Sequence, residues 1–210
     1  MLLRNPPPYR IETERLVVRP YGFADAEQLA EATARSRDHL LPWLPWALEE
    51  PQPVVTKIAL VRRWRGQFDL DVDHVYGIFL ADDRTLVGGS GLHNRIGPGA
   101  REIGYWCHVD HVRKGYVTEA VAALTRVGFE VCGLRKIEIR VQPGNEPSLR
   151  IPRKLGYVDT GVLRSLCPGT DAQTFHDAHV FSLLADEYAA TPSAGATVRA
   201  FDGAGRVVLG

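Results

Sequence analysis

A strand-like segment runs into a helix-like segment with only a short basic loop between them. Residues 101–109 read REIGYWCHV, the loop ends in Arg113, Lys114 and Gly115, and apolar residues then recur at helical spacing from Val117. The first amides of such a helix lack partners and point into the gap beyond the strand. These amides and the helix dipole favour an anion, and Gly115 allows a close approach. The pattern predicts a pyrophosphate site, although a tight turn whose glycine only relieves strain would look the same.

Strand and helix patterns alternate through the rest of the chain. Helical periodicity is expected over 23–36, 54–68, 116–131 and 147–155. Strands are expected over 15–19, 101–109, 136–141, 158–166 and 174–184, with a hairpin over 74–93. The order predicts an α+β fold: a mostly antiparallel sheet with helices on its faces.

Composition narrows the class of protein. The chain has 210 residues, 45% of them hydrophobic, and a formal net charge of zero, so charge gives no reason to expect nucleic acid or an anionic membrane as a partner. No stretch approaches the ~20 apolar residues of a membrane span, and MLLRNPPPYR lacks a secretory core. The three cysteines fit reduced thiols. We expect a cytoplasmic protein.

The C-terminal segment extends beyond the main domain. Residues 1–188 are predicted to form one domain and 189–210 a linker followed by a β-hairpin around 202–205. Val198, Ala200, Val207 and Leu209 give the hairpin an apolar face, so it is expected to dock on the domain or on a second subunit. A frayed tail is the alternative.

Other functional motifs are absent or misplaced. The sequence has no G-x-x-x-x-G-K-[ST] loop, and GGSG at 88–91 lies inside the hairpin without dinucleotide spacing. CHVDH (107–111) and HDAH (176–179) place neighbouring ligands on opposite strand faces. No metal site is predicted.

The loop and its flanks resemble a known family. VRKGYVTEA resembles the acyl-CoA pyrophosphate loop of the GNAT superfamily of N-acyltransferases, with pattern [QR]-x-x-G-x-[GA]. In order along the chain, IETERLVVRPY, HLLPWLPW, REIGYW and NEPSLRIPRKLGY resemble segments of its ribosomal-protein N-terminal (RimJ/RimL-type) branch. The resemblance covers residues 10–188. It implies the GNAT fold, with a mixed, mostly antiparallel sheet and helices on both faces.

The resemblance also implies which residues hold acetyl-CoA. They are Cys107, His108, Val109, Val112, Arg113, Lys114, Gly115, Tyr116, Val117, Thr118, Asn145 and Ser148. Val112 and Val117 depart from the loop pattern, and Val117 is expected to add bulk near the phosphates. Pro152 replaces the tyrosine with which many GNAT enzymes protonate the leaving thiolate, so that role is expected to fall to Ser148. A first-turn capping role is the alternative for Ser148.

Amine acylation also needs a proton acceptor, because an alkyl amine is largely protonated at pH 7. Glu102 matches the base of the histone-acetylating GNAT enzymes and is the first candidate, with pairing across the sheet as the alternative. His93, which we also expect beside the acceptor, is the reserve base, with a hydrogen-bonded histidine at the end of a strand as the alternative. Trp43 and Trp46 are expected to line the acceptor pocket, although they could instead seal a loop onto the core.

The sequence therefore predicts an acetyl-CoA-dependent N-acetyltransferase acting by direct attack of a primary amine on the thioester. A protein N-terminal α-amine is the leading acceptor. A small-molecule amine, such as an antibiotic or polyamine, is the alternative, as is a non-catalytic acyl-CoA sensor. No metal, nucleic acid or membrane partner is expected, and a homodimer is left open.

Overall fold

The computed structural model describes residues 5–171 and 173–210, so residues 1–4 of the segment examined for a secretory signal lie outside it. The described strands form one sheet in the order β10-β9-β1-β2-β3-β4-β5-β6-β8-β7, antiparallel except for the parallel pair β5–β6. The strands are β1 (Arg10–Glu12), β2 (Leu16–Arg19), β3 (His74–Leu80), β4 (Leu86–His93), β5 (Ala100–Cys107), β6 (Lys136–Val141), β7 (Val158–Pro168), β8 (Phe175–Leu184), β9 (Arg199–Phe201) and β10 (Val207–Leu209).

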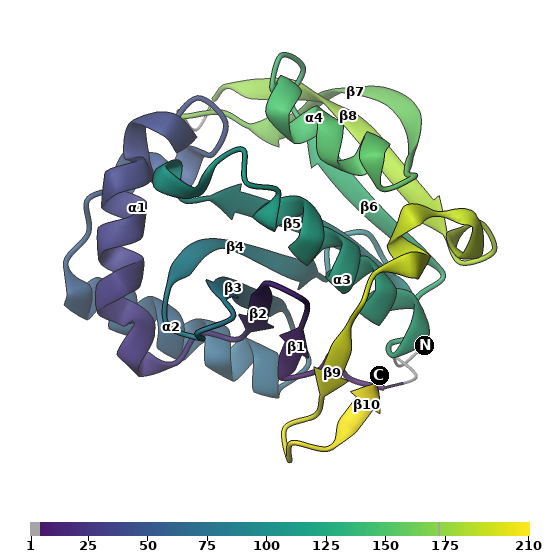
Figure 1. Cartoon of the computed structure of the whole chain (residues 1–210). Helices are drawn as coiled ribbons and strands as arrows, with labels where there is room; N and C mark the ends of the chain where they lie inside the picture. The colour runs from purple at the N-terminus through teal and green to yellow at the C-terminus, as the bar shows by residue number, and fades with distance from the viewer. Residues whose placement is uncertain (1–4, 172) are drawn as a thin grey trace.

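Helices cover both faces of the sheet (Figure 1). On one face α1 (Ala26–Leu40) and α2 (Val54–Asp69) bury Leu29, Val61 and Phe79 in a smaller core. On the other face α3 (Tyr116–Glu130) and α4 (Glu146–Lys154) build the larger core with the sheet. Helix α3 comes very close to β6, because a Cβ on Gly128 would lie 2.7 Å from Ile137. The predicted α+β architecture, with helices on both faces of a mostly antiparallel sheet, is confirmed.

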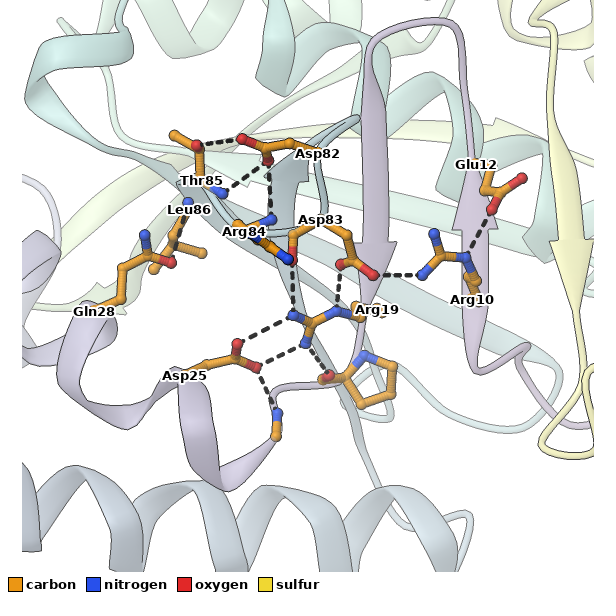
Figure 2. Close-up of polar contacts among 12 residues, drawn as sticks. Arg10, Glu12, Arg19, Asp25, Gln28, Asp82, Asp83, Arg84, Thr85 and Leu86 are labelled. Carbon is orange, nitrogen blue, oxygen red and sulfur yellow. Dashed lines mark hydrogen bonds and ion pairs between the residues drawn. The ribbon is translucent and has the colours of Figure 1, made fainter.

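Arg19 at the end of β2 fixes the start of α1 (Figure 2). Its guanidinium bonds Asp25 at 2.7 Å, just before α1, and Asp83 in the β3–β4 turn at 2.6 Å. Asp25 in turn accepts from the Gly22 amide at 2.7 Å. Arg19 also lies 4.0 Å above the Phe79 ring. These ion pairs join the β3–β4 turn to the start of α1.

The C-terminal segment is docked, as the apolar pattern predicts, but it is not a loose linker. Strand β9 pairs with β1, with Ile11 opposite Ala200, and Figure 1 shows the hairpin, in yellow, beside β1. Ser193 is fully buried and donates to the Leu155 carbonyl. The Ala196 carbonyl accepts from Arg126 at 2.6 Å. Val207 is 57% exposed, whereas Val198, Ala200 and Leu209 pack on the larger core and form the apolar face of the hairpin.

Two short elements depart from the sequence expectations. Strand β1 has only three residues and was not predicted, because it is too short to show alternation. The loop between α1 and α2 contains a 3-10 turn over Pro45–Glu49. Within residues 5–171 and 173–210, no helix combines the length and apolarity that crossing a bilayer requires.

Candidate active site

The parallel strands β5 and β6 separate in the middle of the sheet. They pair only from Ala100 to Glu102 on β5, although β5 continues to Cys107 and β6 to Val141. Beyond Glu102 one edge of β5 therefore faces a gap where the ladder to β6 is missing. Backbone groups at this edge are free to bond an inserted molecule.

The start of α3 lies at the far end of β5 and has the geometry of an anion site. Gly115 is its N-cap at φ 81°, and no side chain caps the first turn. Arg113 is also left-handed, at φ 62°; alternating turn conformations of this kind turn successive amides toward one point. Arg113 and Lys114 are exposed. Arg15 lies beside them in the β1–β2 turn, where it donates to the Lys114 carbonyl at 3.1 Å and forms an ion pair with Glu119 at 2.6 Å. The first helical amides and these cations together suit a pyrophosphate.

The other residues predicted to hold acetyl-CoA divide into two groups. Tyr116, Val112 and Thr118 are half-buried around the start of the helix, and Val109 donates its amide to Ser36 Oγ at 3.1 Å. Val117 is 8% exposed and packs into the larger core, so it does not add the expected bulk near the phosphates. Its side chain points inward because it lies on the face of α3 that packs on the sheet.

Cys107 and His108 close the carboxyl end of β5. Burial raises the pKa of Cys107 to about 11, so the thiol is protonated at neutral pH. His108 is buried, and its Nδ1 accepts from the Asp110 amide at 3.1 Å. Both side chains therefore serve the local turn, while the backbone that follows them leads into the anion site.

The start of α4 faces β5 across the gap. Asn145 caps α4, and its Oδ1 accepts from the Ser148 amide at 3.3 Å. Ser148 Oγ donates to Tyr105 Oη at 3.1 Å, and Tyr105 Oη donates to the Ser148 carbonyl at 3.0 Å. Burial raises the pKa of the Tyr105 phenol, which keeps it protonated. Ser148 is therefore not a capping hydroxyl; its Oγ is a hydrogen-bond donor to a side chain of β5.

A cavity of about 640 Å³ lies on the opposite face of β5, under α1 and α2. Trp46, Trp64 and Trp106 form much of its apolar wall, and Gly104, Tyr105 and Trp106 bring it to the gap between β5 and β6. Trp46 packs edge-on against Trp106, with ring centroids 6.1 Å apart. Trp46 is among the residues that line this cavity. Trp43 is not; its ring lies by Gly144 in the β6–α4 loop, 4.0 Å from where a Cβ would be.

A buried ion pair supports the cavity wall beneath α2. Lys57 Nζ bonds Glu50 Oε1, and both side chains are almost inaccessible, at 3% and 2% exposed. Glu50 also accepts from the Gln52 amide at 3.1 Å. Both charges are satisfied within the wall, so they hold the 3-10 turn to α2.

Glu102, the predicted base, lies at the point where β5 and β6 separate. Its two oxygens bond different arginines, Arg95 at 3.4 Å and Arg140 at 3.2 Å. Arg140 also bonds Glu138 at 3.2 Å. Glu102 is therefore part of an ion network across the sheet and is not among the residues that line the cavity.

His93, the reserve base, does line the cavity and has one hydrogen-bonded partner. Its Nδ1 lies 3.0 Å from Asp73 Oδ2. Burial alone would raise the pKa of Asp73, but the hydrogen bond and charge of His93 outweigh it and lower the pKa. Sequence reasoning missed Asp73, Tyr105 and Arg15 because each acts through a fold contact 20 or more residues away. Of these three residues, Tyr105 could most readily have been found from the sequence, because it lies in REIGYW, a segment that resembles the GNAT family.

No group of three or more His, Cys, Asp or Glu side chains within the described ranges is placed to share a metal ion. This holds for CHVDH and HDAH too.

Known proteins resemble this chain in sequence and in fold. Residues 15–158 match the family model described as an acetyltransferase (GNAT) domain. A Bacillus subtilis protein described as putative ribosomal N-acetyltransferase YdaF is 31% identical over 178 residues, covering 83% of this chain and 94% of that protein. The Escherichia coli [ribosomal protein uS5]-alanine N-acetyltransferase is 26% identical, covering 75% and 82%.

A solved structure extends the agreement to the fold. Mycobacterium smegmatis RimJ, solved in complex with CoA-disulfide, superposes with a TM-score of 0.74 at 22% identity, covering 89% of this chain and 90% of that one. The family model spans most of the domain that carries β5, the gap and the start of α3. These relatives include described ribosomal-protein acetyltransferases, and the chain is a member of the GNAT family and an N-acetyltransferase.

Proposed function

We propose that this N-acetyltransferase transfers the acetyl group of acetyl-CoA to the α-amine of a protein N-terminus. One observation carries the proposal: the cavity borders the last residues of β5, and the anion site follows the end of the same strand. Gly104, Tyr105 and Trp106 line the cavity, and β5 ends at Cys107, shortly before the Gly115 turn. A donor held at the turn and an amine held in the cavity would react in the gap between β5 and β6.

The residues at the turn fit acetyl-CoA. The uncapped first turn of α3 would take the pyrophosphate, with Arg113 and Lys114 at the rim. The free edge of β5 beyond Glu102 would bond the pantetheine arm as a missing strand does. When bound, acetyl-CoA supplies the activated acyl group.

Ser148 would stabilise the sulfur as it leaves. Its Oγ already donates a hydrogen bond, to Tyr105, and can turn toward a developing thiolate while Tyr105 stays anchored on the Ser148 carbonyl. The phenol, protonated through burial, stands behind Ser148 as the next proton source. Ser148 and Tyr105 would thus act together on the thiolate that leaves from acetyl-CoA.

Two acceptor classes fit the cavity. The ribosomal descriptions of the relatives favour a protein N-terminus, and the half-exposed Trp46 at the cavity wall suits an inserted first residue. The volume of about 640 Å³ also suits a small-molecule amine, which is the second candidate.

Thiol release measured across an amine panel tests the proposal. The panel holds peptides with ribosomal-protein N-termini, the same peptides blocked at the α-amine but with a free lysine, polyamines and aminoglycosides. We expect kcat/KM for the best free α-amine peptide to exceed that for any other class by at least tenfold. A preference for polyamines or aminoglycosides would replace the proposal by the second candidate.

A further inference from the structure

The Nε2 end of the His93 ring lies over a cross-strand pair of glycines. Gly91 on β4 is paired with Gly104 on β5. A Cβ on Gly91 would lie 2.5 Å from His93 Nε2, and one on Gly104 would lie 3.4 Å from the same atom. Side chains at either position would compete with the imidazole for this space. The two glycines thus leave room for Nε2 above Gly104 on β5, within the stretch of β5 that is not paired with β6.

The two ring nitrogens of His93 differ: Nδ1 is hydrogen-bonded to Asp73, and Nε2 is available to another molecule. Asp73 accepts from Nδ1, with its two oxygens at 3.0 and 3.1 Å, and also from the Asn94 amide at 3.2 Å. A proton on Nδ1 leaves a lone pair on Nε2. Within residues 5–171 and 173–210, Nε2 has no hydrogen-bond partner. His93 is thus oriented to accept a proton from a molecule in the cavity.

The charged groups around His93 also single out Asp73 as the partner of its ring. Asp73 faces it from the α2–β3 loop, Arg95 from the β4–β5 loop, and Glu102 stands opposite it on β5. Further along the cavity wall are Glu49, Glu50, Lys57 and Arg63. Since Glu102 is bonded to Arg95 and Arg140, the carboxylate that lies closest to the ring and bonds it is Asp73.

We propose that His93 is the general base that takes the proton from the acceptor ammonium, that Asp73 is its positioning residue, and that Glu102 instead holds Arg95 and Arg140 in place. The proposal rests on the acetyl transfer proposed above, for any primary amine. His93 Nε2 takes one proton from the ammonium and passes it to water. The neutral nitrogen then forms the amide C–N bond, the thioester C–S bond breaks, nitrogen loses a second proton, and the thiolate gains one. One proton is released overall.

Steady-state kinetics with acetyl-CoA and the best acceptor of the panel test the base. His93→Gln should lower kcat/KM at least ~100-fold at pH 7. For an α-amine acceptor the defect should shrink to less than ~10-fold near pH 9.5, where that amine is already neutral. His179→Gln is the matched control, because His179 Nδ1 also bonds an aspartate, Asp159, at 3.0 Å but lies outside the cavity. It should match the wild type. Calorimetry should give unchanged CoA affinity for both variants.

Asp73 and Gly91 provide independent variants. Asp73→Asn should lower kcat more than it changes KM, because Nδ1 loses the carboxylate that orients the ring. Asp73→Glu should recover part of the loss. Gly91→Ala should displace the ring and lose activity although every titrating group is retained; because its Cβ would also lie 2.9 Å from the His74 carbonyl oxygen, its denaturation midpoint is measured as well. Nitrogen-15 NMR of the free protein should show the His93 proton on Nδ1, and this signal should change in Asp73→Asn.

The outcomes separate the two proposals. If some amine is acetylated by the wild type but His93→Gln is as active as His179→Gln at pH 7, the base assignment is overturned whichever acceptor was best. A larger pH-dependent loss in Glu102→Gln than in His93→Gln would overturn it in favour of Glu102. An NMR signal with the proton on Nε2 would overturn the role of Asp73. Preference for a non-peptide amine would overturn only the acceptor class.

Discussion

Tyr105 takes the hydrogen bond that Pro152 cannot make. In a regular helix the amide of residue 152 would donate to the carbonyl of Ser148, but proline has no N–H. The Tyr105 phenol donates to that carbonyl instead, at 3.0 Å. The same contact brings Tyr105 Oη within 3.1 Å of Ser148 Oγ. A proline within α4 is thereby tied to the placement of the proposed leaving-group donor.

The first prediction tests this exchange by stability. Tyr105→Phe leaves the Ser148 carbonyl without its donor and should lower the free energy of unfolding by about 1–2 kcal/mol. Adding Pro152→Ala restores a backbone N–H at position 152, so the double variant should regain most of the loss in urea denaturation. Its turnover should stay below that of the wild type, because Ser148 still lacks the phenol. Full recovery of turnover would show that Tyr105 acts only on the helix.

Ser148→Ala should affect the reaction more than binding. The hydroxyl interacts most strongly with a thiolate that exists only late in transfer. Its loss should raise the activation free energy by about 2–4 kcal/mol, so kcat should fall roughly 30- to 1,000-fold. CoA affinity from calorimetry should change less than threefold. Ser148→Thr, which keeps a hydroxyl, is the matched control. Wild-type turnover of Ser148→Ala with chemistry rate-limiting would assign thiolate protonation elsewhere.

Gly115→Glu should abolish CoA binding. The carboxylate would stand beside the first amides of α3, where the pyrophosphate is proposed to bind, and the backbone at φ 81° disfavours any side chain. Gly205→Glu is the control for the strain alone, because Gly205 has φ 76° in the C-terminal hairpin with nothing within 4 Å of a built Cβ. It should bind CoA normally in calorimetry. Unchanged affinity in a folded Gly115→Glu protein would move the phosphate site.

Lys57→Met should destabilise the domain. It leaves Glu50 charged, buried and unpaired, which costs about 3–5 kcal/mol. Lys57→Met combined with Glu50→Gln should recover most of this, because no net charge remains and the glutamine oxygen can still accept from the Gln52 amide. The exposed Lys154→Met is the control. Equal denaturation midpoints for Lys57→Met and Lys154→Met would contradict the buried pair.

Acid should remove the contribution of Asp83. Burial opposes its ionisation, but hydrogen bonds from Arg10 and Arg19 outweigh burial and lower the pKa of Asp83 below its ordinary value. A carboxyl whose pKa is lower in the folded state stabilises the fold above its unfolded pKa of about 3.9, and this is lost as pH falls through the folded pKa. Asp83→Asn should therefore be less stable than the wild type at pH 7, with the difference closing below pH 4. Asparagine tolerates the φ of 58° at this position. A constant difference across pH would contradict the assignment.

The long elements could be predicted from the sequence because their own periodicity specifies them. Helix α3 begins at the glycine and buries Val117, Ala120, Val121 and Leu124, the residues that share one face in the sequence. The anion turn was found in the same way, since Gly115 and its cations are adjacent in sequence.

What could not be predicted is what the fold brings together. Asp73 reaches His93 only because β3 and β4 form a hairpin, and Tyr105 reaches Ser148 only across the gap between β5 and β6. Glu102 matched a family pattern by position, but two arginines from other segments bond its oxygens. Local sequence patterns predict the helices and strands. Contacts between distant segments determine which acidic, basic or cationic side chains are already paired and which can contact a substrate.

The pairing of β9 with β1 has a consequence for how the protein matures during translation. Residues 10–12 emerge from the ribosome long before their partners at 199–201, and closing so long a loop is entropically costly and slow. Until residue 201 is made, β1 has β2 on one side and an unpaired rim on the other. A nascent chain would therefore expose an unpaired edge strand, which favours aggregation, for most of its synthesis. Completion of the C-terminal hairpin would pair that edge.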